Sequence, residues 1–285
     1  MTCAPQRIMR NPTPGKKPSK TQTKQKAPGV ERKMKPRADH GERSYRGSGK
    51  LEDLAAIITG GDSGIGRAVA IAFAREGADV AIGYFSEKEE EDANETVGWI
   101  EQAGRRAIKQ RFDVQQLDEC KRFVDKAVKK FGRLDILVNN AGYQKEQHSI
   151  LDISPEQLEG TFRTNIFGFF FMVQSALPHM KAGAVILNTG SVTALKGNES
   201  LIDYSATKGA IHVFTKSLAQ SLARKGIRVN CVAPGPVWTP HGKGTYWDRP
   251  AQPAEIAPSY VFLASEDARY YTGEILAPTG SETSR

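Results

Sequence analysis

Ile57-Ile58-Thr59-Gly60-Gly61-Asp62-Ser63-Gly64-Ile65-Gly66-Arg67 joins a short apolar run to a cluster of glycines, and a helical pattern follows at positions 68–74. This order predicts a strand, a tight turn and a helix. Glycines in such a turn let backbone N–H groups approach an anion, and the positive end of the helix dipole points at the same spot. A phosphate or pyrophosphate group is therefore the expected ligand of this turn.

Three interpretations of the turn compete. Gly61 and Gly66 have the separation found in the phosphate loop of nucleoside triphosphatases, but that motif continues with Lys and then Ser or Thr. Positions 67–68 hold Arg and Ala, which argues strongly against it. A purely structural turn is the second interpretation. The third is a dinucleotide-binding turn built on Gly60, Gly64 and Gly66, and the rest of the chain has to decide between these last two.

Length and composition favour one large domain of about 230 residues with a tail, because a chain of 285 residues that is 39% hydrophobic can bury a full core. No apolar run reaches membrane-spanning length, and residues 1–49 contain no hydrophobic signal segment. Cys3, Cys120 and Cys231 are scattered, so neither a disulfide framework nor a zinc site is expected. The acidic run at 87–92 is interpreted as a helix start instead of a metal site. We expect a cytoplasmic protein without a metal.

The positive charge is concentrated in the N-terminal tail. Residues 1–50 carry fourteen Lys and Arg against three acidic residues, a formal net charge of +11, so the remaining 235 residues total −3. The tail is rich in Pro, Lys, Gln and Thr and lacks the apolar content to fold alone. A flexible basic arm over 1–50 is the favoured interpretation, and attraction to a polyanion is the alternative. Residues 45–51 are expected to pack as a lead-in on the edge of the domain.

From Leu54 onward the chain alternates strands and helices, which predicts an α/β fold with a doubly wound parallel sheet in one domain, residues 51–285. The predicted strands cover 57–59, 79–84, 107–112, 136–138, 184–188, 228–232 and 275–276. The predicted helices cover 68–74, 87–103, 117–131, 155–181, 203–225 and 253–264.

The glycine turn has the form Thr-Gly-x-x-x-Gly-x-Gly and resembles that of the short-chain dehydrogenase/reductase family. Other parts of the family pattern follow in order, with Asp113-Val114 after the third strand and Asn139-Asn140-Ala141-Gly142 after the fourth. These groups fall at the carboxyl ends of successive strands, where doubly wound folds bind ligands. The resemblance covers residues 51–280, and the lead-in resembles that of glucose/ribitol-dehydrogenase-like, general stress members. It implies a Rossmann-type fold.

The residues expected to perform acid–base catalysis lie in the segment Tyr204-Ser205-Ala206-Thr207-Lys208. Tyr204 and Lys208 are four residues apart and project from one face of a helix. A phenol of pKa about 10 is a weak catalyst near neutrality, and a nearby ammonium is expected to lower that pKa. Alone, such a pair is more often a feature of a solvated amphipathic helix. The resemblance adds Ser191 as the catalytic serine and Asn165 as the asparagine that holds a water in a proton relay to the lysine.

The resemblance implies hydride transfer between a nicotinamide and a carbonyl/alcohol pair, with Tyr204 as the general acid and base. Ser191 would position the substrate oxygen, and Lys208 would also hold the nicotinamide ribose. The implied cofactor-binding residues are Gly60, Asp62, Ser63, Gly64, Ile65, Gly66, Tyr84, Asp113, Val114, Asn140, Ala141, Gly142, Tyr204, Lys208, Pro234, Gly235, Val237 and Thr239.

The cofactor is expected to be NADP or NAD, with NADP favoured. Tyr84 and Phe85 stand at the end of the second strand, where NAD enzymes usually place an acidic residue on the ribose 2′-hydroxyl. No acidic side chain is therefore expected there to repel the 2′-phosphate of NADP. Arg67 is the candidate for binding that phosphate.

The expected function is oxidoreduction of a small aldehyde, ketone, sugar or polyol. The alternative is a dinucleotide-binding, stress-associated protein with vestigial catalysis and a basic arm that contacts a polyanion. A homotetramer is expected by resemblance, with the apolar stretch 167–172 partly in the interface, and neither nucleic acid nor membrane is an expected partner. Positions 240–252 are too few for the usual substrate lid, which predicts an open pocket with broad selectivity.

Overall fold

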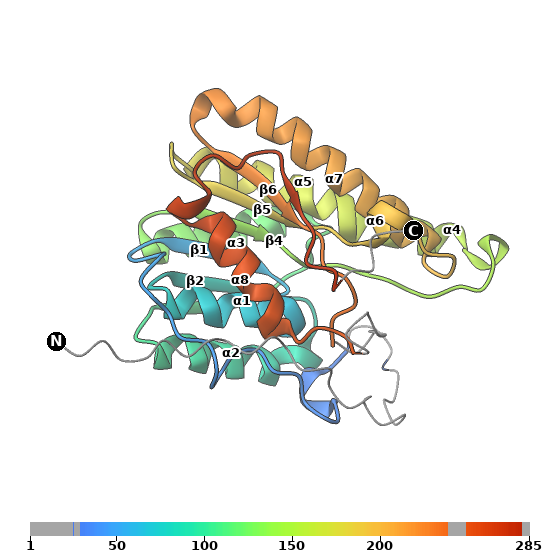
Figure 1. The fold of residues 1–285 in the computed structure, drawn as a ribbon, viewed down its shortest axis with the longest axis horizontal. Helices are drawn as coiled ribbons and strands as arrows, with labels where there is room; N and C mark the ends of the chain where they lie inside the picture. The colour runs from blue at the N-terminus through green and yellow to red at the C-terminus, as the bar shows by residue number, and fades with distance from the viewer. Residues whose placement is uncertain (1–24, 26–28, 239–248, 281–285) are drawn as a thin grey trace.

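The computed structural model describes residue 25, residues 29–238 and residues 249–280, and these form a parallel sheet with helices on both faces (Figure 1). The sheet has seven strands in the order β3-β2-β1-β4-β5-β6-β7. Its strands are β1 (Ala55–Thr59), β2 (Asp79–Tyr84), β3 (Ala107–Arg111), β4 (Ile136–Asn139), β5 (Val185–Thr189), β6 (Arg228–Val232) and β7 (Ile275–Leu276). All seven predicted strands are confirmed, with ends that differ by at most two residues.

β1 lies in the interior of the sheet, and both of its edges are paired. Ile57 is in register with Ala81 of β2 on one side and with Leu137 of β4 on the other. The chain therefore winds outward from β1 in one direction through β2 and β3 and in the other through β4 to β7. The carboxyl ends of β1 and β4 lie at the point where the strand order reverses, which is where doubly wound folds open a ligand crevice.

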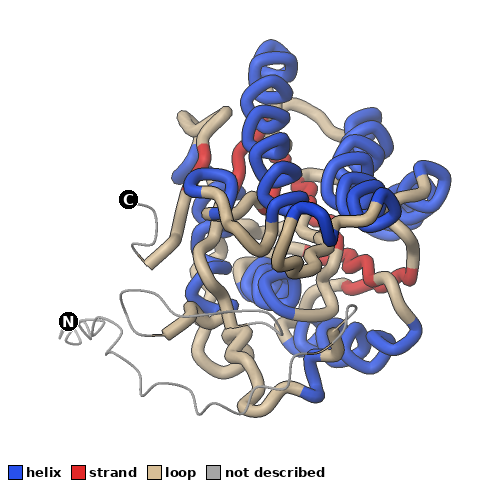
Figure 2. The backbone as a smooth tube through the Cα atoms, turned by 90° about the vertical axis from the view of Figure 1, so that its right-hand side faces the viewer, coloured by secondary structure: helices blue, strands red, loops and turns tan. Residues whose placement is uncertain are grey.

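Helices cover the two faces of the sheet, as Figure 2 shows. One apolar core lies under α1 (Gly64–Arg75), α2 (Glu90–Gln102) and α8 (Pro253–Ala264). The other lies under α3 (Leu117–Phe131), α5 (Gly168–Ala176) and α7 (Ile202–Leu222). Two further helices, α4 (Pro155–Phe162) and the unpredicted α6 (Thr193–Lys196), pack against α7. None of the helices within the described residues combines the length and apolarity that crossing a membrane requires.

The helix predicted over 155–181 is less regular than expected. α4 runs into a π-helical turn, η4 (Arg163–Phe167), which continues into α5 and then a 3₁₀ turn, η5 (Leu177–His179). The prediction of one uniform helix is therefore wrong, although its extent is nearly right. π-helical turns within α-helices occur frequently at functional sites.

The N-terminal segment corrects another prediction. Val30, Met34 and Ala38 are buried, and Met34 and Ala38 form an apolar cluster with Trp238. Residues 29–50 therefore pack on the domain, and the flexible arm predicted over 1–50 is wrong for this part. The reason is that the domain supplies partners for its charges, as in the ion pair of 2.9 Å between Arg32 Nε and Glu91 Oε2. Residues 1–24 and 26–28 lie outside the described residues.

The predicted lead-in at residues 45–51 is confirmed as a packed segment. The backbone amides of Ser48 and Lys50 donate to Glu76 Oε2 at 2.8 and 3.0 Å, and the hydroxyl of Tyr45 donates to Oε1 of the same carboxylate. Glu76 is the C-terminal cap residue of α1. The lead-in is thereby fixed at the end of α1 that lies away from the glycine turn.

Candidate active site

The glycine turn between β1 and α1 is a close approach that only glycine permits. Gly60 and Gly64 have positive φ values of 63° and 50°, a region that costs little only without a Cβ. A Cβ on Gly66 would lie 1.9 Å from the carbonyl oxygen of Gly60. The predicted strand, tight turn and helix are present, and α1 begins at Gly64 as expected for an anion-binding helix N-terminus.

Asn140, at the carboxyl end of β4, locks this turn in place. Its Nδ2 donates to the carbonyl oxygens of Thr59 and Gly60 at 3.1 and 3.2 Å. The hydroxyl of Thr59 in return accepts from the amides of Asn140 and Ala141, both at 2.9 Å. Two adjacent strand ends are thus held together at the point where the strand order reverses.

The neighbouring predicted groups also lie at the carboxyl ends of strands. Asn139 Nδ2 donates to Asn188 Oδ1 at 3.0 Å across β4 and β5, which braces the sheet. Asp113 follows β3, and its Oδ1 accepts from the amide of Gln115 at 2.9 Å. Val114 lies so close to α5 that a Cβ on Gly168 would be 3.0 Å from its side chain.

The catalytic candidates meet on the N-terminal part of α7. Lys208 is 2% exposed, and its Nζ donates to the carbonyl oxygen of Thr189, the last residue of β5, at 2.7 Å. The same Nζ is 5.3 Å from the centroid of the Tyr204 ring. The hydroxyl of Ser191 lies close enough to that of Tyr204 to lower its pKa. The structure therefore brings together Ser191, Tyr204 and Lys208, as the sequence predicted.

The protonation states differ from the expectation. Burial raises the pKa of Tyr204 to about 12, and the neighbouring hydroxyl of Ser191 lowers it only in part. Burial also lowers the pKa of Lys208 to about 8. The prediction that Lys208 lowers the pKa of Tyr204 is therefore wrong for the protein alone, because removal from water disfavours both charged forms more than the pair favours them.

Asn165 lies in the π-helical turn and joins three segments. Its Oδ1 accepts from the amide of Tyr143 at 2.7 Å, while its Nδ2 donates to the carbonyl oxygen of Tyr143 at 2.9 Å and to Thr207 Oγ1 at 3.0 Å. A Cβ on Gly142 would lie 3.6 Å from Asn165 Oδ1 and 3.8 Å from Lys208 Nζ. Asn165 thus holds the loop after β4 beside the lysine.

The predicted turn after β6 closes the site from the other side. The amide of Gly235 donates to the carbonyl oxygen of Pro278 at 3.1 Å, and that of Val192 donates to Pro234 at 2.9 Å. Val237 is buried and forms an isolated parallel bridge with Ala251. Thr239 and most of the segment 240–252 lie outside the described residues, as does His241.

At the end of β2 the structure corrects the expected role of Arg67. Its Nε donates to the carbonyl oxygen of Asp62 at 2.9 Å, its Nη2 to that of Asp92 at 2.8 Å, and its Nη1 to Glu95 Oε2 at 3.2 Å. The side chain is only 2% exposed. The guanidinium of Arg67 is therefore bonded to Asp62 and to α2, and it is not directed at a 2′-phosphate. Tyr84, the other residue considered there, donates its hydroxyl to Glu90.

Three residues that contact the candidate site residues were missed from the sequence: Thr189, Thr207 and Asp92. Thr207 lies inside the Tyr-x-x-x-Lys segment, so its place beside Asn165 could have been examined as part of that motif. The contact between Asp92 and Arg67 carries no local signal, because the two residues are 25 positions apart. Within the described residues, no group of three or more His, Cys, Asp or Glu side chains is arranged to hold a metal ion.

The chain is similar over most of its length to known oxidoreductases. Residues 60–280 match a family model described as enoyl-(acyl carrier protein) reductase. Glucose and ribitol dehydrogenase of Daucus carota is 46% identical over 276 residues, which cover 91% of this chain and 95% of that protein. NADPH-dependent aldehyde reductase 1, chloroplastic, of Arabidopsis thaliana is 47% identical over 280 residues, which cover 92% and 97%.

A solved structure agrees with these relatives. A short chain dehydrogenase from Burkholderia cenocepacia J2315, crystallised in complex with NADP, superposes with a TM-score of 0.78 at 32% identity. The match covers 81% of this chain and 98% of that one. The fold described above is therefore shared with a protein that was crystallised in complex with NADP.

Proposed function

We infer that this chain, which belongs to the short-chain dehydrogenase/reductase family and is thus an NAD(P)-dependent oxidoreductase, acts on small carbonyl and alcohol substrates with Tyr204 as its general acid and base. The observation that carries the proposal is the meeting of Tyr204, Ser191 and Lys208 beside the glycine turn. A phenol, a hydroxyl and a buried ammonium are the groups that proton transfer to a substrate oxygen requires.

The residues present fit a dinucleotide. Gly66 lets the first turn of α1 pack directly against the backbone of Gly60, where a Cβ would lie 1.9 Å from the carbonyl oxygen, and the N-terminus of α1 would offer its free amides to a phosphate. Lys208 offers its ammonium to a ribose, and Asp113 and Val114 lie where the adenine is held in a doubly wound fold. When bound, NADP(H) or NAD(H) supplies or accepts the hydride.

The protein's own part in the reaction is to hold and move a proton. A Tyr204 pKa of about 12 keeps the phenol protonated near neutrality, so in carbonyl reduction it is ready to give its proton to the substrate oxygen. The hydroxyl of Ser191, which lies beside that of Tyr204, would orient that oxygen as charge develops on it. In the alcohol-oxidation direction the same phenol has to lose its proton, and Lys208 favours that step when it is charged.

The substrates we propose are small aldehydes, sugars and polyols. The carrot relative is named for glucose and ribitol, and the Arabidopsis relative for aldehydes. Tyr143, in the loop that Asn165 holds, would line the pocket with Tyr204 and Ser191.

We also propose that the enzyme is a cytoplasmic homotetramer. Phe167 and Phe170, at the start of α5, are each 44% exposed, and such apolar side chains are typical of an interface between copies. Light scattering at micromolar concentration tests this assembly, and a monomer would contradict it.

Turnover assays test the proposed activity. We expect oxidation of NADPH or NADH in the presence of small aldehydes and ketones, and reduction of the oxidised cofactor with polyols. Broad selectivity with high KM is the expected pattern. No turnover of any compound despite measurable cofactor binding would contradict the proposal and favour the vestigial alternative, and a single tightly bound substrate would overturn the expectation of an open pocket.

A further inference from the structure

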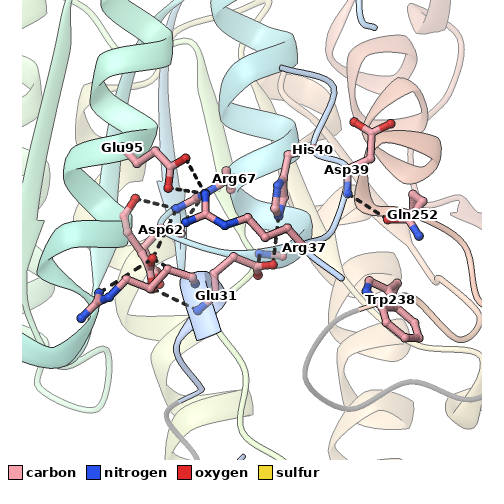
Figure 3. A network of polar contacts seen from close by, with 12 residues as sticks. Glu31, Arg37, Asp39, His40, Asp62, Arg67, Glu95, Trp238 and Gln252 are labelled. Atoms are coloured by element: carbon pink, nitrogen blue, oxygen red, sulfur yellow. Dashed lines mark hydrogen bonds and ion pairs between the residues drawn. The ribbon is translucent and has the colours of Figure 1, made fainter. Parts of the chain in front are cut away.

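The segment of residues 29–40, termed here the N-terminal strap, lies against the cofactor turn and carries charges that the mechanism does not use. Figure 3 shows Glu31, Arg37 and His40 of the strap near Arg67 of α1 and Glu95 of α2, and the backbone of Asp39 bonded to Gln252. These contacts join parts of the chain that are far apart in sequence. The strap therefore contacts the glycine turn, although it belongs to none of the family's motifs.

Glu31 is the strap residue in contact with the turn. It is 2% exposed, and its Oε2 accepts from the backbone amide of Gly64, the first residue of α1, at 3.1 Å. The first amides of a helix have no acceptor within the helix, and Ser63, the N-cap residue, makes no side-chain cap bond here. Glu31 thus caps α1 from a position 33 residues upstream.

A buried carboxylate at this place needs a compensating charge. His40 Nε2 is 3.6 Å from Glu31 Oε1, and its Nδ1 is 3.1 Å from Glu42 Oε1. The imidazole and the amide of Gly64 hold the pKa of Glu31 below its usual range, while the two carboxylates raise the pKa of His40. The negative charge of Glu31 beside the turn is thus compensated by two positive groups, the imidazolium of His40 and the guanidinium of Arg67.

The other contacts of the strap fix Glu31 in place. The amides of Glu31 and Arg32 donate to the carboxylate of Asp92 on α2 at 3.0 and 3.3 Å. Farther along, Trp238 Nε1 donates to the carbonyl oxygen of Pro36 at 3.2 Å. The amide of Asp39 donates to Gln252 Oε1 at 2.9 Å. The strap is therefore bonded to α2 near its beginning and to Trp238 and Gln252 near its end, and these bonds keep Glu31 beside the turn.

We propose that Glu31 is a positioning residue of the cofactor site. By holding the amide of Gly64, it fixes the first turn of α1, so that the amides of Ile65 and Gly66 remain aimed at the pyrophosphate of a dinucleotide. This inference rests on the proposed function, because it assigns the turn to cofactor binding. Its consequence is that a residue outside the catalytic motifs sets cofactor affinity.

The chain offers a matched control at the opposite end of α1. Glu76, the C-terminal cap residue of α1, is also 2% exposed, and it accepts two backbone amides of the N-terminal region, those of Ser48 and Lys50. A buried carboxylate that accepts backbone amides therefore joins the N-terminal region to each end of α1: Glu31 of that region beside the turn, and Glu76 of the helix away from it. A purely structural role predicts the same effect for both residues.

The test compares full-length wild type, Glu31→Ala, Glu31→Gln and Glu76→Gln by fluorescence titration with NADPH and by steady-state kinetics, with thermal melting to confirm folding. We expect Glu31→Ala to raise the Kd for NADPH at least about tenfold while kcat at saturating cofactor stays within about twofold. Glu31→Gln keeps an acceptor for Gly64 and should raise Kd by about threefold. Glu76→Gln should leave Kd within about twofold of wild type.

Several results would overturn the inference. Unchanged or tighter NADPH binding in Glu31→Ala would show that the carboxylate does not position the turn. Equal losses in Glu31→Gln and Glu76→Gln would show general destabilisation, and Glu31→Gln decides the question if Glu31→Ala does not fold. Failure of the wild type to bind either NADPH or NADH would instead contradict the proposed function itself.

Discussion

The catalytic corner of the site and the start of α1 are built in different ways. In the catalytic corner, one turn of α7 and the end of β5 supply Tyr204, Lys208 and Ser191. Burial raises the pKa of the phenol, which stays neutral, and lowers the pKa of the lysine. Around Gly64 the groups are charged, and Glu31 and Arg67 are compensated by partners from other segments. Different residues therefore support proton transfer and phosphate binding. A substitution in one region should alter one of these two functions and leave the other intact.

Tyr204→Phe should produce the largest effect on the catalytic corner. Removing the hydroxyl deletes the exchangeable proton and leaves the ring in place, so kcat should fall by about 10²–10⁴. The Kd for NADPH should stay within about twofold, because the first turn of α1 is untouched. Steady-state kinetics and a fluorescence titration measure the two quantities.

Tyr45→Phe is a matched control, because it removes a hydroxyl that donates to Glu76 far from the reaction. Its kcat should equal that of the wild type. Near-normal turnover in Tyr204→Phe would remove this tyrosine from the mechanism.

The pH dependence of cofactor binding should show the second largest effect. Burial places the pKa of Lys208 at about 8, so its ammonium is present below that pH and is lost as pH rises. If the ammonium holds the ribose, the Kd for NADPH should rise above pH 8 and approach about tenfold per pH unit.

Lys208→Arg keeps a charge throughout this range, so its Kd should be weaker overall but flat between pH 7 and 10. The measurement is a titration with NADPH at a series of pH values at constant ionic strength. A parallel rise of Kd in both proteins would show that another group is responsible.

The same comparison explains which features could be predicted from the sequence. Tyr204 and Lys208 lie within one helical turn, and the glycine turn is a continuous stretch, so residue type and spacing were enough. The sheet followed because strands and helices alternate along the chain, and strands such as β4 are separate apolar runs. The resemblance to glucose/ribitol-dehydrogenase-like members is confirmed by the relatives.

The contacts at the start of α1 could not be found in this way. Glu31 reaches Asp92 over 61 residues and Gly64 over 33, and no local pattern encodes such pairs. The same limitation misled the prediction for Arg67, whose partners Asp92 and Glu95 lie on the next helix. The prediction of a lowered pKa for Tyr204 was wrong because burial raises that pKa, and the spacing of residues in a sequence does not reveal burial.

Arg67→Met tests the charged region directly. Arg67 and Asp92 are 2% and 1% exposed, and removing Arg67 leaves this buried carboxylate with only Arg32, at 3.9 Å, as a cationic partner among the described residues. We expect the free energy of unfolding to fall by about 3 kcal/mol in urea titrations. The ratio of kcat/KM with NADPH to that with NADH should stay within about twofold, because the guanidinium binds α2.

Arg122→Met, which removes an exposed ion pair with Glu119, should change the free energy of unfolding by less than about 0.5 kcal/mol. A selective loss of activity with NADPH in Arg67→Met would restore the phosphate-binding role that the structure denies to this residue.

Tyr84→Phe should have the smallest effect. Tyr84 ends β2, is 6% exposed, and donates its hydroxyl to Glu90, which also pairs with Lys109. Burial and this carboxylate raise the pKa of Tyr84 above its ordinary value, so the hydroxyl stays protonated and directed at Glu90. A group engaged in this way has little to offer a ribose or its phosphate. The ratio of kcat/KM values with NADPH and NADH should therefore change by less than about threefold. A change of tenfold or more would mean that the hydroxyl turns to the cofactor when it binds, and that cofactor choice is made at the end of β2 after all.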